Sequence, residues 1–177
     1  MFRVLFSIVG NMNEYQVAAI FERLPNNHRI DAIRQMLRES TLPDVLKDRV
    51  LYFCRCFDIC ADNRHAIMHS HSGGIFTSYS RNARGIRLSK YSKSGIRLVC
   101  AASLADLRSV ADDINCIANF GGNICSNIRI FLICRDRDDE AAFWRIPLRD
   151  KPPLPTKLNW VPEADLVRPP QPESSQE

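Results

Sequence analysis

The stretch PDVLKDRVLYFCRCFDICADNRHAIMH, residues 43–69, carries the longest helical pattern in the chain. Thr41 suits an N-cap and Pro43 a first turn, so a helix is expected from Pro43 to about His69. Apolar side chains spaced by three and four residues lie on one face of such a helix and pack against a core. In this stretch they are Leu46, Val50, Phe53, Cys54, Phe57, Cys60, Ala61 and Met68.

Further helices are expected on both sides of this stretch. Residues 2–23 have helical spacing and predict one or two helices, residues 24–27 predict a turn, and helix resumes through Leu37. Ser103 is a suitable N-cap for another helix, with Asp106 at the position of a capping carboxylate. That helix is expected to continue to Phe120 and to end or kink at Gly121-Gly122. Residues 127–134 fit both a buried strand and a last helix, and we favour the helix.

Residues 75–101 change to a β-type pattern. Three short β-prone runs occur there, separated by Gly85 and Gly95, which predicts a small antiparallel hairpin or meander. Before it, the paired glycines Gly73-Gly74 suit a chain reversal after the long helix. Because isolated hairpins are marginally stable, this insert is expected to pack on the helices.

The predicted fold is therefore mainly α, a helical bundle of about four to five helices with a small antiparallel β-hairpin insert. A helical domain is expected over residues 1–135, including the insert at 75–101. The chain has 177 residues, which is enough for one real core. After residue 135 come an acidic cluster and seven prolines between 152 and 172, so residues 136–177 are expected to form a proline-rich tail, extended or disordered.

Cysteine usage and hydropathy indicate the compartment. The seven cysteines include no Cys-x-x-Cys pair and do not resemble a secreted disulfide framework, so reduced thiols in the cytoplasm are expected. No run of about 18 apolar residues occurs, and no membrane span is expected. The apolar residues 1–10 lack the small-residue cleavage site of a signal peptide.

The candidate site lies at the end of the long helix, in Arg64-His65-Ala66-Ile67-Met68-His69. Cleavage of RNA without a metal needs a base for the ribose 2′-hydroxyl, a fixed cation on the phosphate and an acid for the leaving oxygen. Histidine exchanges protons near neutrality, and the arginine fork matches phosphate oxygens. On an ideal helix Arg64 and His69 differ by roughly 140° in azimuth, so they converge only through a frayed helix end or the long arginine side chain. His65 and His69 share a face.

This stretch resembles the Arg–polar–x–x–x–His signature of HEPN (higher eukaryotes and prokaryotes nucleotide-binding) domains, small helical bundles with the motif late in a long helix. The resemblance covers roughly residues 1–135. It implies a cytoplasmic, metal-independent ribonuclease of defence or toxin type, without a cofactor. Arg64 would bind the phosphate, His69 would be catalytic and His65 the variable polar residue, where asparagine is commoner. Two motifs would meet across a homodimer, and an antitoxin or another protein is a further partner the resemblance suggests. Many members of the superfamily lack nuclease activity, which leaves a non-catalytic RNA- or nucleotide-binding or dimerisation module as the alternative.

A second feature indicates a nucleic-acid partner. Residues 63–105 contain no Asp or Glu, so the insert is basic while the rest of the chain is net negative. Basic side chains neutralise phosphates, and aromatic faces stack on unpaired bases. The candidate nucleic-acid-binding residues are Arg81, Arg84, Arg87, Lys90, Lys93, Arg97, Tyr79 and Tyr91. The same pattern also fits a solvated hairpin whose aromatic side chains pack inward.

Two other interpretations of the motif remain open. Arg64 and His69 also fit a polar helix C-terminus, where cations interact favourably with the helix dipole. His65, His69 and His71 are suitable metal ligands, but no carboxylate follows Asp62 nearby to complete a typical site. No metal is therefore expected.

Overall fold

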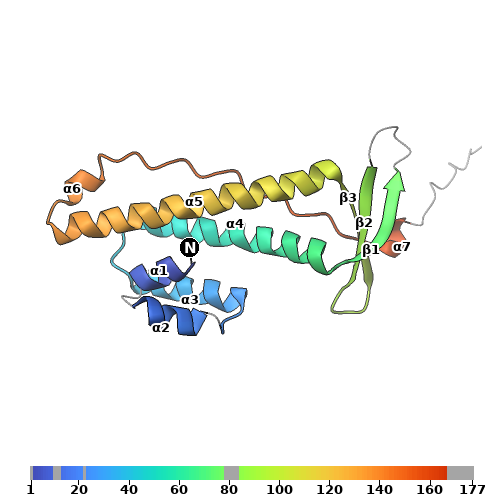
Figure 1. Ribbon diagram of the computed structural model, residues 1–177, viewed down its shortest axis with the longest axis horizontal. Helices are drawn as coiled ribbons and strands as arrows, with labels where there is room; N and C mark the ends of the chain where they lie inside the picture. The colour runs from blue at the N-terminus through green and yellow to red at the C-terminus, as the bar shows by residue number, and fades with distance from the viewer. Residues whose placement is uncertain (1, 10–12, 22, 78–83, 167–177) are drawn as a thin grey trace, which may run out of the picture. The chain divides into compact units, whose positions relative to one another are not determined.

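The structure is a computed structural model that describes residues 2–9, 13–21, 23–77 and 84–166. It is mainly α-helical with a small antiparallel sheet, which confirms the predicted fold class (Figure 1). Its elements are α1 (Phe2–Val9), α2 (Glu14–Phe21), α3 (Asn26–Glu39), α4 (Asp44–His69), β1 (His71–Thr77), β2 (Arg84–Tyr91), β3 (Arg97–Ser103), α5 (Leu104–Asp136), α6 (Glu140–Phe143), β4 (Val161–Pro162) and α7 (Glu163–Leu166).

The chain divides into two compact units. The helical unit comprises Met1–Asp58 and Asp113–Pro155, and the sheet unit comprises Ile59–Asp112 and Thr156–Glu177. Both α4 and α5 contribute residues to each unit. The predicted site therefore belongs to the sheet unit.

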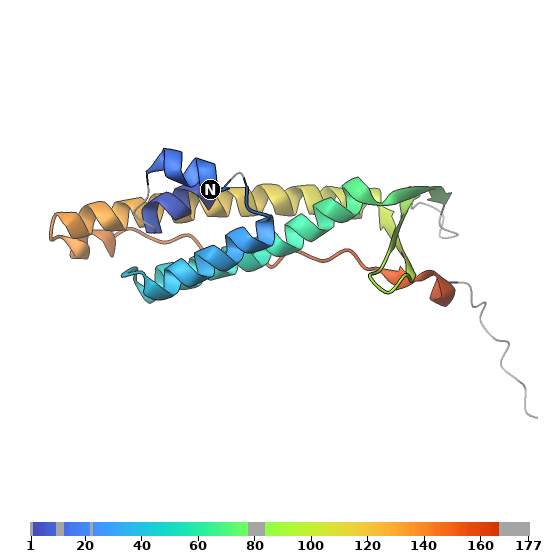
Figure 2. The same cartoon turned by 90° about the horizontal axis from the view of Figure 1, so that it is seen from below.

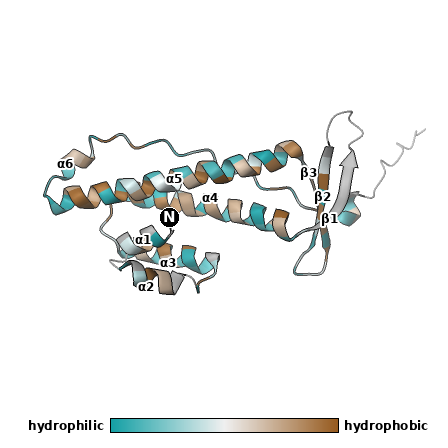
Figure 3. Cartoon of the chain, viewed as in Figure 1, coloured by the Kyte–Doolittle hydropathy of each residue, from teal (hydrophilic) through white to brown (hydrophobic). Residues whose placement is uncertain are grey.

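The core of the helical unit is formed by the apolar faces of its helices. The ring of Tyr52 on α4 contacts that of Phe120 on α5 edge to face, with centroids 6.1 Å apart. Phe131 packs in the same way on Phe143 of α6 at 5.3 Å. Figure 3 shows the alternation of apolar and polar residues along α5 that produces these contacts. The fully buried side chains of this unit include Leu5, Ile30, Ile33, Leu46, Val50, Ile124, Ile128 and Phe143.

Two helix boundaries differ from the prediction. α5 is one helix of 33 residues that passes through Gly121-Gly122, so these glycines do not end it, and residues 127–134 are helical as favoured. Each helical glycine costs about 1 kcal/mol relative to alanine, and burial of Ile117, Ile124 and Ile128 on either side of the pair offsets that cost. The predicted turn at residues 24–27 is also shorter, because α3 begins at Asn26.

The sheet has the strand order β1-β2-β3-β4, with every pair antiparallel. Three strands were predicted, but the glycines play other roles than expected. Gly73 and Gly74 do not reverse the chain: they lie inside β1, where the register shifts between Ser72 and Ile75 as in a bulge. Gly85 lies inside β2, opposite Ser103.

The turn between β2 and β3 does need its glycine. Gly95 has φ 79°, a conformation that side chains other than glycine rarely adopt. Its N–H donates to the Ser92 carbonyl at 3.0 Å, and the Ser92 N–H donates to the Ile96 carbonyl at 2.8 Å. Gly95 thus closes the hairpin, as its position between two β-prone runs predicts.

One face of the sheet builds the core of its unit. Leu88, Cys100 and Ala102 are buried there. They pack against Ile67 of α4 and Leu107 of α5, and against Leu158 and Trp160 from the far end of the sequence. The insert therefore packs on helices, as expected for a hairpin that would be only marginally stable by itself.

Residues 156–166, which we call the C-terminal segment, contribute to this unit. β4 pairs with β3 through Val161–Val99 and Pro162–Leu98, and α7 follows directly. Both views place α7 beside the sheet (Figures 1 and 2). Part of the proline-rich stretch thus supplies a fourth strand to the sheet.

In the part of the chain that the structure describes, one helix, α5, reaches the length and hydropathy of a membrane span. Of its most apolar part, 39% is buried inside the protein. Core helices of soluble proteins can be as long and as apolar, so this is weak evidence for a span. All seven cysteines are free, and the buried ones are Cys54, Cys56, Cys60, Cys100 and Cys125.

Candidate functional site

The predicted motif occupies the last turns of α4, which stays helical through His69. Asn63 and Ala66 face inward and are each 3% exposed. With about 100° per residue, the side chains of Arg64, Met68, His65 and His69 follow one another around the opposite side. All four are exposed, and we call them the exposed arc. The residues predicted to be catalytic therefore share one solvent-facing surface.

The two histidines of the arc lie together. The imidazole rings of His65 and His69 are 4.5 Å apart between centroids, with their planes tilted by 40°. One helical turn separates them, so α4 itself sets this geometry. Two imidazole rings thereby lie side by side on the surface of the helix.

Arg64 lies at the other edge of the arc. Its side chain is exposed, and within the described ranges it has neither an ion pair nor a side-chain hydrogen bond. The helix end is not frayed, so Arg64 and His69 keep their separation of about 140° in azimuth. Met68 and His65 lie between them, and Met68 is 64% exposed.

Asp62 is the acidic residue at the border of the arc. It is exposed and precedes His65 by three positions, which places both on one face of α4. A carboxylate at that spacing can orient an imidazole through its ring N–H.

Asn63 is a site residue that the sequence analysis did not single out. Its side-chain Nδ2 donates to the carbonyl of Thr156 at 2.8 Å, and its Oδ1 accepts from the N–H of Leu158 at 3.0 Å. Asn63 thereby joins the end of α4 to the C-terminal segment. The predicted apolar stripe of α4 did not indicate Asn63, because that stripe placed Met68 inward at the end of the helix. The structure corrects this prediction: Met68 is 64% exposed and Asn63 is buried.

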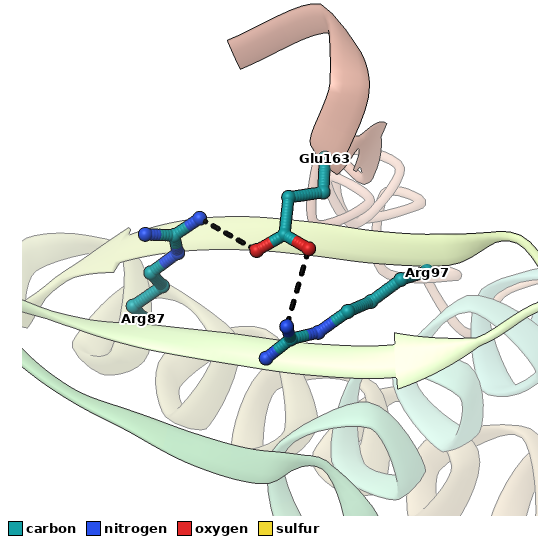
Figure 4. Close-up of polar contacts among 3 residues, drawn as sticks. All are labelled: Arg87, Arg97 and Glu163. Carbon is teal, nitrogen blue, oxygen red and sulfur yellow. Dashed lines mark hydrogen bonds and ion pairs between the residues drawn. The ribbon is translucent and has the colours of Figure 1, made fainter. Parts of the chain in front are cut away.

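Three cationic side chains of the basic insert have partners within the protein. Arg87 Nη2 lies 3.1 Å from Glu163 Oε1, and Arg97 Nη1 lies 3.2 Å from Glu163 Oε2, so one carboxylate joins two strands (Figure 4). Lys90 Nζ lies 4.1 Å from the ring centroid of Trp160. Although residues 63–105 contain no acid, the fold brings one to them from the C-terminal segment.

The other candidate nucleic-acid-binding residues are distributed as follows. Lys93, in the turn after β2, is exposed, and Tyr91 is 69% exposed. Arg84 begins β2, and only its backbone is described. Tyr79 and Arg81 lie outside the described residues.

A cavity of about 470 Å³ lies elsewhere in the sheet unit, at the start of α5. Burial raises the pKa of the Cys100 thiol in its wall. Hydrogen bonds from the Ser103 hydroxyl and N–H lower the pKa of Asp106 below its ordinary value. The cavity is lined by Cys100, Ala101, Asp106, Ser109, Val110, Thr156, Lys157, Leu158 and Asn159, and so does not include the exposed arc.

Among the residues described, no group of three or more His, Cys, Asp or Glu side chains is placed to hold a metal ion. Comparison of the chain with protein-family models, curated proteins and solved structures finds no match.

Proposed function

We propose that this protein is a metal-independent ribonuclease whose active site is built on the exposed arc of α4. The observation that carries the proposal is the contact between the His65 and His69 rings on the same exposed arc as an arginine that no acid neutralises within the described residues. A base, an acid and a fixed cation are the groups that cleavage next to a ribose 2′-hydroxyl requires.

In this reaction one imidazole removes the proton of the 2′-hydroxyl, and the 2′-oxygen attacks the adjacent phosphorus. The bond from phosphorus to the 5′-oxygen breaks, and the second imidazole, in its protonated form, gives that oxygen a proton. The products are a 2′,3′-cyclic phosphate and a 5′-hydroxyl. His69 and His65 would share the two proton transfers, and Arg64 would hold the non-bridging phosphate oxygens through its planar fork.

The position of Arg64 supports a site shared between two copies of the chain. Arg64 is separated from its own His69 by about 140° around α4. A twofold axis beside α4 would let the arginine of one protomer approach the histidines of its partner. The exposed Met68 between them is an apolar side chain that such a contact would cover. The proposed enzyme is a homodimer that acts in the cytoplasm, with an antitoxin or another protein as a further proposed partner.

The wide separation of Arg64 and His69 also favours a second candidate, a non-catalytic RNA- or nucleotide-binding or dimerisation module. In this role the exposed cations would hold phosphate without cleaving it.

The test is cleavage of a fluorescent single-stranded RNA by the purified protein in EDTA. The wild type is expected to release fragments with cyclic phosphate ends, and His69→Ala and Arg64→Ala are expected to lose at least about 100-fold in rate. His28→Ala and Arg38→Ala are the matched controls, since both residues are exposed on α3. Binding without cleavage by every variant would support the second candidate, and equal activity of wild type and His69→Ala would overturn the proposed site.

A further inference from the structure

The face of the sheet opposite its core carries a covered cationic site. Side chains alternate along strands, so Arg87, Ser89 and Tyr91 of β2 share a face with Arg97 and Val99 of β3. Ser89 and Val99 pair at its centre, and they are 5% and 1% exposed.

The two arginines approach one point from opposite sides of that central pair. The register sets Arg87 and Arg97 four residues apart along the strands, or about 13 Å. Their long side chains bend inward, and each guanidinium binds one oxygen of the Glu163 carboxylate (Figure 4). The guanidinium N–H groups that bind carboxylate oxygens also bind the non-bridging oxygens of a phosphodiester.

The contact that covers this site is weakly held. The side chains of Arg87, Arg97 and Glu163 are 41%, 46% and 32% exposed, and ion pairs so open to water contribute little to stability. β4 contributes only two residues to the sheet, and one of them, Pro162, has no N–H to donate. Upstream, Asn63 fixes Thr156 and Leu158, so α7 can leave while the rest of the C-terminal segment stays bound.

We infer that Arg87 and Arg97 form a backbone-phosphate site for single-stranded RNA, and that Glu163 occupies this site in the free protein as a built-in competitor. RNA binds by displacing α7 and taking the place of the carboxylate between the two arginines. Tyr91, which lies opposite Arg97 and is 69% exposed, offers its ring to a base next to the bound phosphate. The choice of RNA as ligand rests on the proposed function, whereas the anion site rests on the contacts themselves.

The experiment measures binding of a fluorescent 2′-O-methyl oligoribonucleotide, which has no free 2′-hydroxyl and cannot be cleaved. Anisotropy titrations over a salt series compare the full-length wild type with Glu163→Gln. Asp165→Asn is the matched control, because it removes the same charge from an exposed position on the same short helix. Glu163→Gln is expected to bind at least about fivefold more tightly than Asp165→Asn. Both affinities are expected to fall with rising salt, with a log–log slope of about −0.7 for each phosphate held.

Two further measurements test the same mechanism. Arg87→Gln or Arg97→Gln, added to Glu163→Gln, is expected to abolish the gain. Hydrogen exchange across α7 (Glu163–Leu166) in the wild type is expected to accelerate when the oligonucleotide binds, because α7 leaves the sheet.

Equal affinities of Glu163→Gln and Asp165→Asn would overturn the inference, even in a protein that cleaves RNA. A gain seen only with a polyglutamate peptide would also overturn it, since the site would then be one for acidic protein segments. The predicted gain in a protein without cleavage activity would support the inference while removing the proposed nuclease.

Discussion

Asn63 and Leu158, 95 residues apart in the chain, are joined by a hydrogen bond of 3.0 Å from the Leu158 N–H to Asn63 Oδ1. The same side chain donates to the Thr156 carbonyl, so one amide satisfies two backbone groups of the C-terminal segment. Asn63 precedes Arg64 directly. The residue that anchors the segment therefore also holds the end of α4 that carries the candidate site.

Asn63→Ala is expected to lower the free energy of unfolding by about 1–3 kcal/mol, because it leaves two backbone groups without their partner in a part-buried place. Urea denaturation followed by circular dichroism measures the change. Asn159→Ala is the control, since Asn159 lies in the same segment but is exposed. A loss of the same size in both variants would contradict the anchoring role.

A composite site predicts complementation between two inactive variants. When Arg64→Ala and His69→Ala proteins are mixed and allowed to exchange subunits, about half of the dimers are mixed, and one of the two sites in each has an intact arginine and an intact histidine pair. About a quarter of the wild-type RNA cleavage is expected to return. If the mixture stays as inactive as its components while subunit exchange is demonstrated, each site is built from a single chain.

The cap of α5 predicts a pH-dependent stability. Asp106 Oδ2 accepts hydrogen bonds from the N–H and the hydroxyl of Ser103, both at 2.7 Å, and the Asp106 N–H donates to Ser103 Oγ at 3.1 Å. The pKa of Asp106 is lowered in the folded state, so its carboxylate stabilises the fold above the ordinary aspartate range. That contribution is lost as the pH falls through the lowered value.

Asp106→Ala is accordingly expected to cost about 0.5–1 kcal/mol at neutral pH, a modest figure because the cap is exposed to solvent. The difference from wild type should shrink below about pH 4. Chemical denaturation at a series of pH values measures it, with Asp112→Asn, exposed on the same helix, as the control. A difference that stays constant with pH would show that the ionised cap is not the cause.

The thiols are expected to differ sharply in reactivity. Burial raises the pKa of Cys54 to about 12 and also raises the pKa of Cys56 and Cys125. Because the thiolate is the reactive form, N-ethylmaleimide should modify the exposed Cys116 first in the native protein. Mass spectrometry of partly labelled protein gives the order, and urea should make all seven react. Early labelling of Cys54 in the native state would contradict its buried position.

Local patterns in the sequence were sufficient for much of the fold. The spacing of apolar residues predicts α4 to its last residue, because helical periodicity depends on neighbours three and four positions away. The Ser103–Asp106 cap spans three residues and was found for the same reason. The residues of the candidate site, from Arg64 to His69, were also named from the sequence, since they follow one another on a single helix.

The sequence alone could not predict contacts between residues that lie far apart in the chain. Gly121-Gly122 suggested a helix end, but α5 continues through them, and isoleucines on either side of the pair are buried. The segment without acids at 63–105 suggested free cations, yet Glu163 reaches Arg87 from 76 positions away. No periodicity connects such residues. Their contact comes from the strand pairing of β4 with β3 and the anchoring of the C-terminal segment by Asn63, and these are decided by the tertiary structure.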